Sequence, residues 1–293
     1  MSEISNVPKI GAEKIQSGTG IKARPVHITP DQPIGLFDSG VGGLTVVKEI
    51  MRKLPSEDLV YVADTARVPY GGRSSKEIIK INVEIINFLM SKKVKMVVMA
   101  CGTSSSIAYP VLKDEYPVPI ISMIEPGSKA ALNASRNKVI GIIATVGTVH
   151  SMAYQEAIRR MDPSARPLAA ACPLFVPLIE GGFTEAEETK KVAREYLKPL
   201  LAEGIDTLIM GCTHYPHISK LLKGILGPHV ALIDPAREAA NLVLTTLKEE
   251  NLLAENKKAQ YEYFVSGSAP QFVELGSRLL GRPIAGAEQV KFG

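Results

Sequence analysis

The sequence predicts two similar α/β domains with mostly parallel sheets and an active site in the cleft between them. Residues 34–43 (IGLFDSGVGG) and 140–149 (IGIIATVGTV) each consist of a short apolar strand that opens into a loop of small residues. Further along each half, an apolar strand ends at a cysteine, Cys101 in MACGTSSS and Cys212 in MGCTHYP. A pattern repeated over this distance indicates a duplicated α/β unit. We therefore expect each half to bring one thiol to a shared cleft.

The composition excludes several classes of protein. The chain has 293 residues, 45% hydrophobic and 22% charged, which suits two domains of ordinary size. Its apolar runs are shorter than the roughly 20 residues that a membrane-spanning helix needs, so we expect a cytoplasmic protein without a membrane partner. The net charge of +4 is spread along the chain, and Trp is absent. Nucleic-acid binding is therefore not expected, whereas a small anionic ligand is compatible.

The repeats also predict the domain organisation. Residues 1–32 are polar and show no sustained period, so we expect a flexible N-terminal extension. We assign residues 33–127 and 234–293 to the first α/β domain, because a predicted strand at 261–265 and a predicted helix at 269–280 complete it. Residues 128–233 form the second domain in this prediction.

The first half opens with a strand at 34–37, a glycine-rich loop and a helix at 44–54. This order can hold an anion on backbone N–H groups. Thr45 occupies the position of the third glycine, however, so the dinucleotide-binding fingerprint is broken. Asp38, taken alone, is more typical of a turn or helix-cap residue than of a functional acid.

A second loop in the first half, residues 68–74, follows the next predicted strand. Tyr70 offers a hydroxyl and Gly71 a close-approach backbone N–H, although a turn initiated by Pro69 explains the same sequence. Ser74 or Ser75 is predicted to cap the helix that follows. The strand at 94–99 then leads to the first cysteine.

The second half is predicted to begin with a strand at 139–143. The loop behind it carries Thr145 and Thr148, and we expect Thr148 to cap a helix over 149–161. Cys172 has no counterpart in the repeat and is expected to be a small buried hydrophobic residue. His217 and His229 are predicted to be surface or cap residues.

Two further features of the second half concern acids and helix starts. Glu180 ends an apolar stretch beside two glycines, where it could reach a cleft or remain a solvated loop acid. Thr184 and Glu187 have the spacing of a capping box for a helix that ends near Ala202. Asp234, directly before a proline, is expected to begin another helix.

Two thiols on opposite sides of a cleft suit a particular reaction. A structural zinc site usually has four closely spaced ligands, and acyl transfer through a Cys–His pair needs only one nucleophile. Removing a proton from one face of a tetrahedral carbon and returning it to the other face requires two groups. Racemisation or epimerisation is therefore favoured, with Asp38 and His214 available to relay protons. No lysine or phosphate loop indicates PLP, so we expect chemistry without a cofactor or metal.

The motifs FDSGVGGL, PYG, ACGTSS, ATVGTV, PLIEGG and GCTHYP, in this order, closely resemble the glutamate racemase family. The resemblance covers about residues 33–280 and implies a cofactor-independent enzyme, commonly a homodimer, that supplies D-glutamate for peptidoglycan. It implies that Cys101 acts on D-glutamate and Cys212 on L-glutamate, assisted by Asp38, His214 and Glu180. It also implies contact with the substrate at Asp38, Ser39, Pro69, Tyr70, Gly71, Gly102, Thr103, Thr145, Thr148, Thr213 and His214.

One position departs from the family pattern. Gly102 stands where the family typically has Asn after the first cysteine. A lost hydrogen bond to a charged group is worth about 1.5–3 kcal/mol, which predicts activity lower by roughly one to two orders of magnitude. Two alternatives remain: a racemase for aspartate or another amino acid, and a weakly active relative with a binding or regulatory role. A decarboxylase of the same superfamily needs only one thiol, so the presence of both argues against it.

Overall fold

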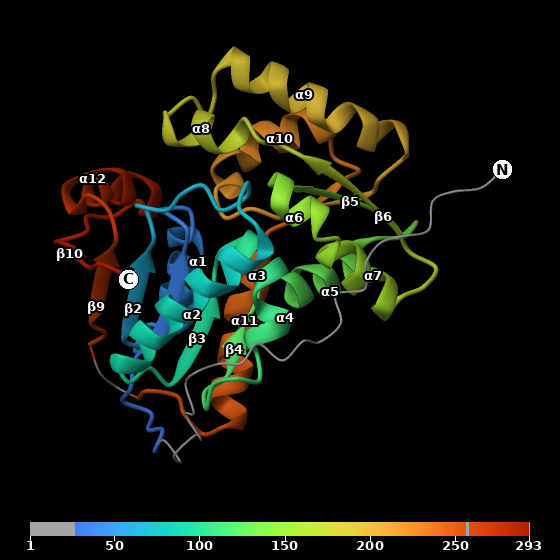
Figure 1. Cartoon of the computed structure of the whole chain (residues 1–293). Helices are drawn as coiled ribbons and strands as arrows, with labels where there is room; N and C mark the ends of the chain where they lie inside the picture. Colours follow the sequence, from blue (N-terminus) through green and yellow to red (C-terminus); the bar gives the residue numbers. More distant parts are fainter. Residues whose placement is uncertain (1–26, 256–257, 293) are drawn as a thin grey trace.

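The computed structural model describes residues 27–255 and 258–292 and contains two parallel β-sheets surrounded by helices (Figure 1). Most of the predicted N-terminal extension, residues 1–26, lies outside the described residues. In the described part, the strand order of the first sheet is β10-β9-β2-β1-β3-β4 and that of the second is β6-β5-β7-β8. The strands of the first sheet are β1 (Ile34–Asp38), β2 (Leu59–Ala63), β3 (Met96–Met99), β4 (Ile120–Ile121), β9 (Tyr261–Val265) and β10 (Glu288–Gln289). Those of the second are β5 (Val139–Ala144), β6 (Arg166–Ala171), β7 (Thr207–Met210) and β8 (Ala231–Ile233).

The two sheets share one topology. In each, the first strand of the half lies between the second and third, and the fourth lies outside the third. All described strand pairs are parallel. The predicted fold of two similar α/β units is thus confirmed, and β9 and β10 extend only the first sheet.

Helices cover both faces of each sheet. Those that precede β5 are α1 (Leu44–Lys53), α2 (Ser75–Ser91), α3 (Gly102–Ile107), α4 (Tyr109–Leu112) and α5 (Ile124–Ala134). Those that follow are α6 (Val146–His150), α7 (Ala153–Met161), α8 (Phe175–Glu180), α9 (Glu187–Ala202), the 3₁₀ helix η1 (Tyr215–Ile218), α10 (Ser219–Leu226), α11 (Pro235–Glu249) and α12 (Ala269–Leu280).

The alternating side chains of the central strand β1 divide the core between the two faces of the first sheet. Ile34 and Leu36 join the cluster formed by α1, α11 and α12, whereas Phe37 joins the cluster beneath α2. All three side chains are fully buried. Burial of each of these side chains stabilises the fold by about 1.5–3 kcal/mol. Strand β1 therefore holds the start of the loop that follows it in a fixed position.

The cap predictions gave mixed results. Ser74 caps α2 in a capping box with Glu77, and Asp234 caps α11. The prediction for Thr148 is wrong, because Thr145 caps the short helix α6 and the left-handed backbone of Met152 (φ 59°) separates it from α7. The two helices change direction at that residue, which a pattern of apolar positions does not encode.

The predicted capping box of Thr184 and Glu187 is also wrong. Helix α9 begins at Glu187, with Ala186 as N-cap and no side-chain hydrogen bond at the cap. Because the helix starts two residues later than the box requires, Glu187 is the first helical residue and pairs with Lys190. The predicted end at Ala202 agrees with the structure.

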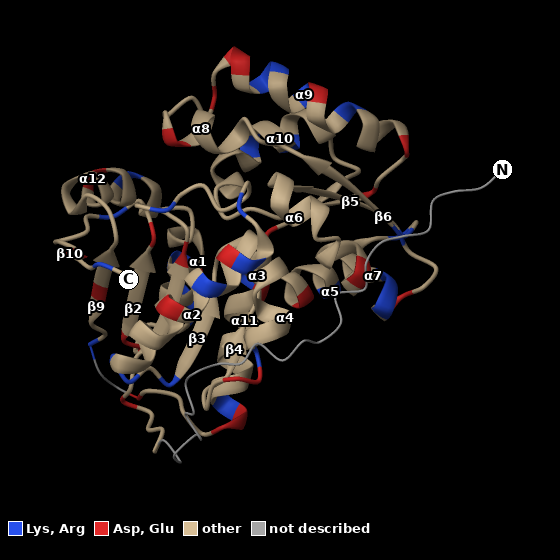
Figure 2. Cartoon of the chain, viewed as in Figure 1, with Lys and Arg blue, Asp and Glu red and all other residues tan. Residues whose placement is uncertain are grey.

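The predictions for surface residues also gave mixed results. Charges of both signs alternate along outer helices such as α9 (Figure 2). His217 is not a surface residue: it is half-buried, and its Nε2 atom is buried without a hydrogen-bond partner. Burial, together with the charges of His214 and Lys48, lowers its pKa to about 4. Among the described residues, no helix has the length and apolar character needed to cross a membrane.

Candidate active site

The candidate site lies where the carboxyl ends of the two sheets meet. Strand β1 ends at Asp38 and β3 leads to Cys101, while β5 leads to Thr145 and β7 to Cys212. Contacts between the halves join these ends, since Thr45 Oγ1 donates to the carbonyl of Thr213 at 3.0 Å. Parallel strands present their carboxyl ends on one edge, so the duplicated topology brings both thiols to one interface.

The first thiol is held on the β1 side of this interface. Cys101 is 5% exposed, and its Sγ lies 3.8 Å from Ser39 Oγ. Burial, and next the negative charge of Asp38, raise the pKa of Cys101 to about 12. This thiol therefore carries its proton at neutral pH.

Asp38 is the last residue of β1 and faces Cys101. Its Oδ2 accepts hydrogen bonds from the N–H groups of Gly40 (3.3 Å) and Gly43 (3.0 Å), and its Oδ1 is buried without a hydrogen-bond partner. Burial raises the pKa of Asp38, against the opposing effect of His214 and of these N–H groups. A carboxylate with one free buried oxygen is suited to accept a proton or an ammonium group.

The second thiol belongs to a chain of polar groups. His214 Nδ1 lies 3.8 Å from Cys212 Sγ, and His214 Nε2 lies 2.9 Å from Glu180 Oε1. The backbone carbonyl of Glu180 in turn accepts a hydrogen bond from Arg278 in α12, at 2.5 Å. The three residues Cys212, His214 and Glu180 therefore have the order of a nucleophile or base, an imidazole and an orienting acid.

The imidazole of His214 favours its charged form. Burial alone would lower its pKa, but hydrogen bonds to Cys212 and Glu180 and the charge of Asp38 outweigh burial and raise the pKa to about 10. The raised pKa means that protonation of His214 stabilises the folded protein. This stabilisation is complete below the ordinary pKa of 6.5 and is lost as the pH rises through about 10. At neutral pH a cation thus lies beside Cys212.

We predict that Glu180→Gln lowers the pKa of His214 toward 6.5, because a neutral amide replaces the carboxylate at Nε2. NMR titration of the imidazole Cε1–H resonance measures this change. Glu185→Gln is the matched control, since Glu185 is exposed and pairs with Lys220 instead. Equal pKa values of His214 in the two variants would contradict the assignment.

The two thiols are close enough to influence each other. Charge on Cys212 contributes to the raised pKa of Cys101. Charge on Cys101 likewise acts on Tyr61 and Tyr70 around it. The predicted convergence of two cysteines on one interface therefore agrees with the electrostatics of the structure.

Hydroxyl groups line the same interface from both halves. Thr145 Oγ1 lies 3.1 Å from Thr103 Oγ1 and 3.0 Å from Thr148 Oγ1, which forms a chain of three hydroxyls across the interface. Thr213, adjacent to Cys212, is 9% exposed. These groups can donate hydrogen bonds to a small anion between the sheets.

The loop of Pro69, Tyr70 and Gly71 reaches the interface through its backbone. Pro69 is exposed, and the Tyr70 hydroxyl donates to Asp64, away from the threonines. Gly71 faces Thr145: a Cβ at Gly71 would lie 3.4 Å from the Thr145 Cβ. In this structure, the part of the loop that lies against the second half is therefore the main chain of Gly71, while the Tyr70 hydroxyl contacts Asp64.

Gly102 lies at a tight approach of the two halves. A Cβ at this position would lie 2.5 Å from the carbonyl oxygen of Gly211, which is closer than real contacts. Behind this contact lies a cavity of about 10 Å³, lined in part by Cys212 and Thr213. Such a space holds about one water molecule.

We predict that Gly102→Ala holds the interface further open, because the added methyl group cannot approach Gly211 as closely. The rates at which Cys101 and Cys212 react with a small thiol reagent should rise severalfold, as measured by mass spectrometry of labelled peptides. Gly40→Ala is the control, since a Cβ there meets nothing within 4 Å. Equal labelling rates in both variants would contradict the role of Gly102.

Sequence reasoning missed two contacts beneath the site. Tyr61 in β2 donates to the carbonyl of Gly40 at 2.7 Å and supports the Asp38 loop. Gly42 leaves room for His214, because a Cβ there would lie 2.4 Å from Nδ1. No short sequence pattern around Tyr61 or Gly42 indicates these contacts, because the partner of each residue lies far along the chain.

All three cysteines are free. Cys172 is fully buried and its thiol faces the carbonyl of Ala170 at 3.6 Å, in agreement with the prediction of a structural role. Within the described residues, no group of three or more His, Cys, Asp or Glu side chains is arranged to hold a metal ion.

Comparisons with known proteins match this architecture. Residues 36–243 match the model of the Asp/Glu/hydantoin racemase family. A glutamate racemase of Geobacter metallireducens is 42% identical over 89% of this chain and 97% of its own. The crystal structure of a glutamate racemase isoform of Bacillus anthracis superposes with a TM-score of 0.86, at 36% identity over 89% of this chain and 97% of that one.

A third relative was solved with a ligand. The glutamate racemase of Francisella tularensis, in complex with D-glutamate, has a TM-score of 0.84 and 36% identity, over 89% of this chain and 98% of that one. The family match covers more than half of the chain, and the identities extend over most of both proteins. The chain therefore belongs to the Asp/Glu/hydantoin racemase family and is an amino-acid racemase.

Proposed function

We propose that this protein interconverts L- and D-glutamate, without a cofactor, by proton transfer between two opposed cysteines. The observation that carries the proposal is the equivalent position of Cys101 and Cys212 after the third strand of two sheets with the same strand order. Similarity to glutamate racemases over most of the chain supports glutamate as the substrate. The complex of the Francisella tularensis relative with D-glutamate adds to this support.

In the proposed reaction, Cys212 removes the α-proton of L-glutamate and Cys101 donates a proton to the opposite face. The raised pKa of Cys101 keeps its proton available for this direction. His214 Nδ1 lies beside Cys212 Sγ to exchange a proton with it, and Glu180 orients the imidazole. For D-glutamate the roles reverse, with Asp38 receiving the proton from Cys101.

The substrate contacts follow from charge and geometry. The free oxygen of Asp38 is proposed to bind the α-ammonium group together with Ser39. The backbone of Gly71 and the hydroxyls of Thr103, Thr145, Thr148 and Thr213 are proposed to bind the carboxylates. Donors aimed at the α-carboxylate also stabilise the negative charge that develops as the α-proton leaves. The Gly71 N–H is assigned to the side-chain carboxylate, which gains no such charge.

Three further parts of the proposal concern the whole protein. We propose that residues 33–127 with 234–293, and residues 128–233, act as the two domains that separate to admit substrate. We also propose a cytoplasmic homodimer, which sedimentation velocity would test. The D-glutamate produced is proposed to serve peptidoglycan synthesis.

Incubation with L- or D-glutamate in deuterated water tests the reaction. NMR follows loss of the α-proton, and circular dichroism follows inversion. Exchange with inversion from both enantiomers is expected. If neither enantiomer exchanges while L- or D-aspartate does, the substrate assignment is wrong; if no amino acid exchanges, the racemase reaction is wrong.

A further inference from the structure

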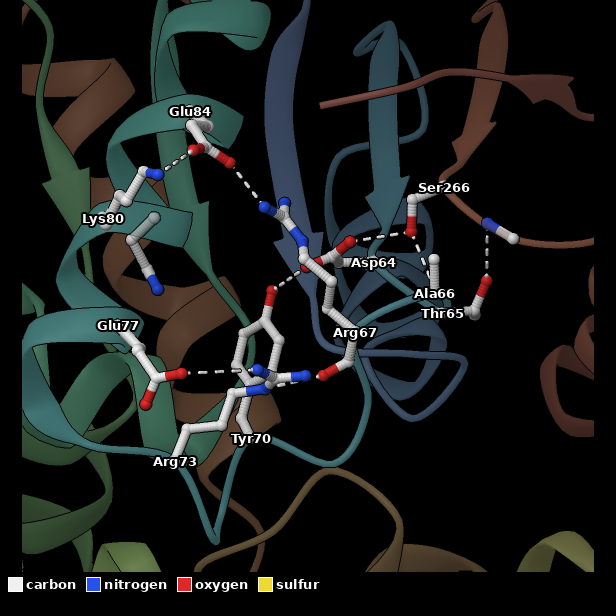
Figure 3. A network of polar contacts seen from close by, with 12 residues as sticks. Asp64, Thr65, Ala66, Arg67, Tyr70, Arg73, Glu77, Lys80, Glu84 and Ser266 are labelled. Carbon is white, nitrogen blue, oxygen red and sulfur yellow. Dashed lines mark hydrogen bonds and ion pairs between the residues drawn. The ribbon is translucent and has the colours of Figure 1, made fainter. Parts of the chain in front are cut away.

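A buried acid at the end of β2, Asp64, organises the loop that leads to Gly71 (Figure 3). Asp64 is fully buried. Its Oδ2 accepts hydrogen bonds from Tyr70 Oη at 2.5 Å and Arg67 Nε at 2.7 Å, and its Oδ1 accepts one from Ser266 Oγ at 2.7 Å. Both oxygens have partners, so the orientation of the carboxylate is fixed.

The contacts of Asp64 bind three separate segments together. Arg67 also pairs with Glu84 in α2, and Ser266 follows β9. The backbone N–H of Asp64 donates to the carbonyl of Asp38 at 3.0 Å. The same residue therefore joins the loop after β2 to the loop that carries a proposed catalytic acid.

Tyr70 connects the Asp64 network to the interface between the sheets. Its side chain is 2% exposed, and its hydroxyl is occupied by Asp64. The next residue, Gly71, lies against the second half: a Cβ at Gly147 would meet the Gly71 carbonyl oxygen at 3.0 Å. The Asp64–Tyr70 hydrogen bond thus sets where the Gly71 main chain lies relative to the threonines.

We propose that Asp64 is a positioning residue for substrate binding, which acts through Tyr70 to hold the Gly71 N–H in place for a substrate carboxylate. This inference rests on the proposed function and adds a residue to its site. Because the loop contacts a carboxylate and not the α-carbon, its displacement weakens binding of substrate and transition state alike. KM changes and kcat does not under such uniform binding.

The test compares Tyr70→Phe with Tyr116→Phe. Tyr70→Phe removes the bond to Asp64 and retains the ring, whereas Tyr116→Phe removes a hydrogen bond to Asn87 (3.3 Å), which does not belong to this network. We expect Tyr70→Phe to raise KM about tenfold for both enantiomers with kcat within about threefold. Tyr116→Phe should change neither.

A double-mutant cycle with Asp64→Asn shows whether Asp64 acts through Tyr70. Asp64→Asn should raise KM in the parent but change it less than about twofold when Tyr70 is already Phe. If KM for Tyr70→Phe equals that of the control, if kcat falls instead of KM rising, or if the two effects add, the proposal is overturned. If Asp64→Asn does not fold, the KM of Tyr70→Phe by itself tests the proposal.

Amide hydrogen exchange of residues 65–73 provides a readout that does not depend on turnover. Exchange in this segment should be faster in Tyr70→Phe than in the parent and unchanged in Tyr116→Phe. If the parent protein racemises no glutamate, the proposed function is wrong. The hydrogen-exchange data then test only whether the Asp64–Tyr70 contact orders the loop. Unchanged exchange in Tyr70→Phe overturns the positioning role in either case.

Discussion

Cys212→Ser should abolish α-proton exchange from L-glutamate while D-glutamate still exchanges slowly and without inversion, and Cys101→Ser should give the mirror-image result. Inversion requires a base on one face and an acid on the other, so each single variant loses it. A positioned acid or base contributes about 10²–10⁴-fold, and serine is a far weaker acid than cysteine. The remaining thiol can still take a proton from its own side and return a deuteron.

The measurement is NMR in deuterated water, with each enantiomer supplied separately and optical rotation followed in parallel. Cys172→Ala is the matched control, because Cys172 is fully buried and lies outside the site residues proposed above; it should retain racemisation. If folded Cys101→Ser and Cys212→Ser lose exchange equally from both enantiomers, the assignment of one thiol to each face is incorrect.

Lys95→Met should lower the free energy of unfolding by about 3–5 kcal/mol, since it leaves a buried charge without its partner. Lys95 and Glu57 have side chains 0% and 1% exposed, and Lys95 Nζ lies 2.6 Å from Glu57 Oε2. Lys95 Nζ also donates to the carbonyls of Pro30 (2.6 Å) and Leu252 (2.8 Å). The ammonium group therefore joins the segments before β1 and after α11 beneath the first sheet.

Thermal unfolding followed by circular dichroism measures this loss, which corresponds to a midpoint lower by about 6–20 °C. Lys220→Met is the control, because its ion pair with Glu185 is exposed (side chains 90% and 74%). Exposed pairs contribute about 0–1 kcal/mol. Adding Glu57→Gln should recover part of the stability of Lys95→Met, because the unpaired charge is removed. Equal midpoints for the two lysine variants would contradict this account.

Local signals predicted much of the secondary structure. The strand over 261–265 and the helix over 269–280 have the predicted bounds, because apolar spacing and flanking caps are properties of neighbouring residues. The same reasoning failed around Thr148 and Thr184. A cap depends on the backbone angles of one or two residues, and packing against the rest of the fold decides those.

The duplicated motifs also predicted the fold class and the strands that carry the two cysteines. A strand ending at Cys101 or Cys212 is a local pattern, and its repetition indicates that both halves follow one path. The sequence resemblance further proposed Glu180 as an assistant of the second thiol. It contained no distance, whereas the structure shows the 2.9 Å contact of Glu180 with His214 across 34 positions.

By itself, the sequence determined the duplicated α/β architecture and the presence of a thiol after one strand of each half, because both follow from local patterns of apolar, small and reactive residues. Only the tertiary structure decided that Tyr70 points to Asp64, that Gly42 accommodates His214, and that Gly102 touches Gly211. These contacts join residues far apart in the chain. Their geometry is fixed by how the two sheets pack together, which no short stretch of sequence encodes.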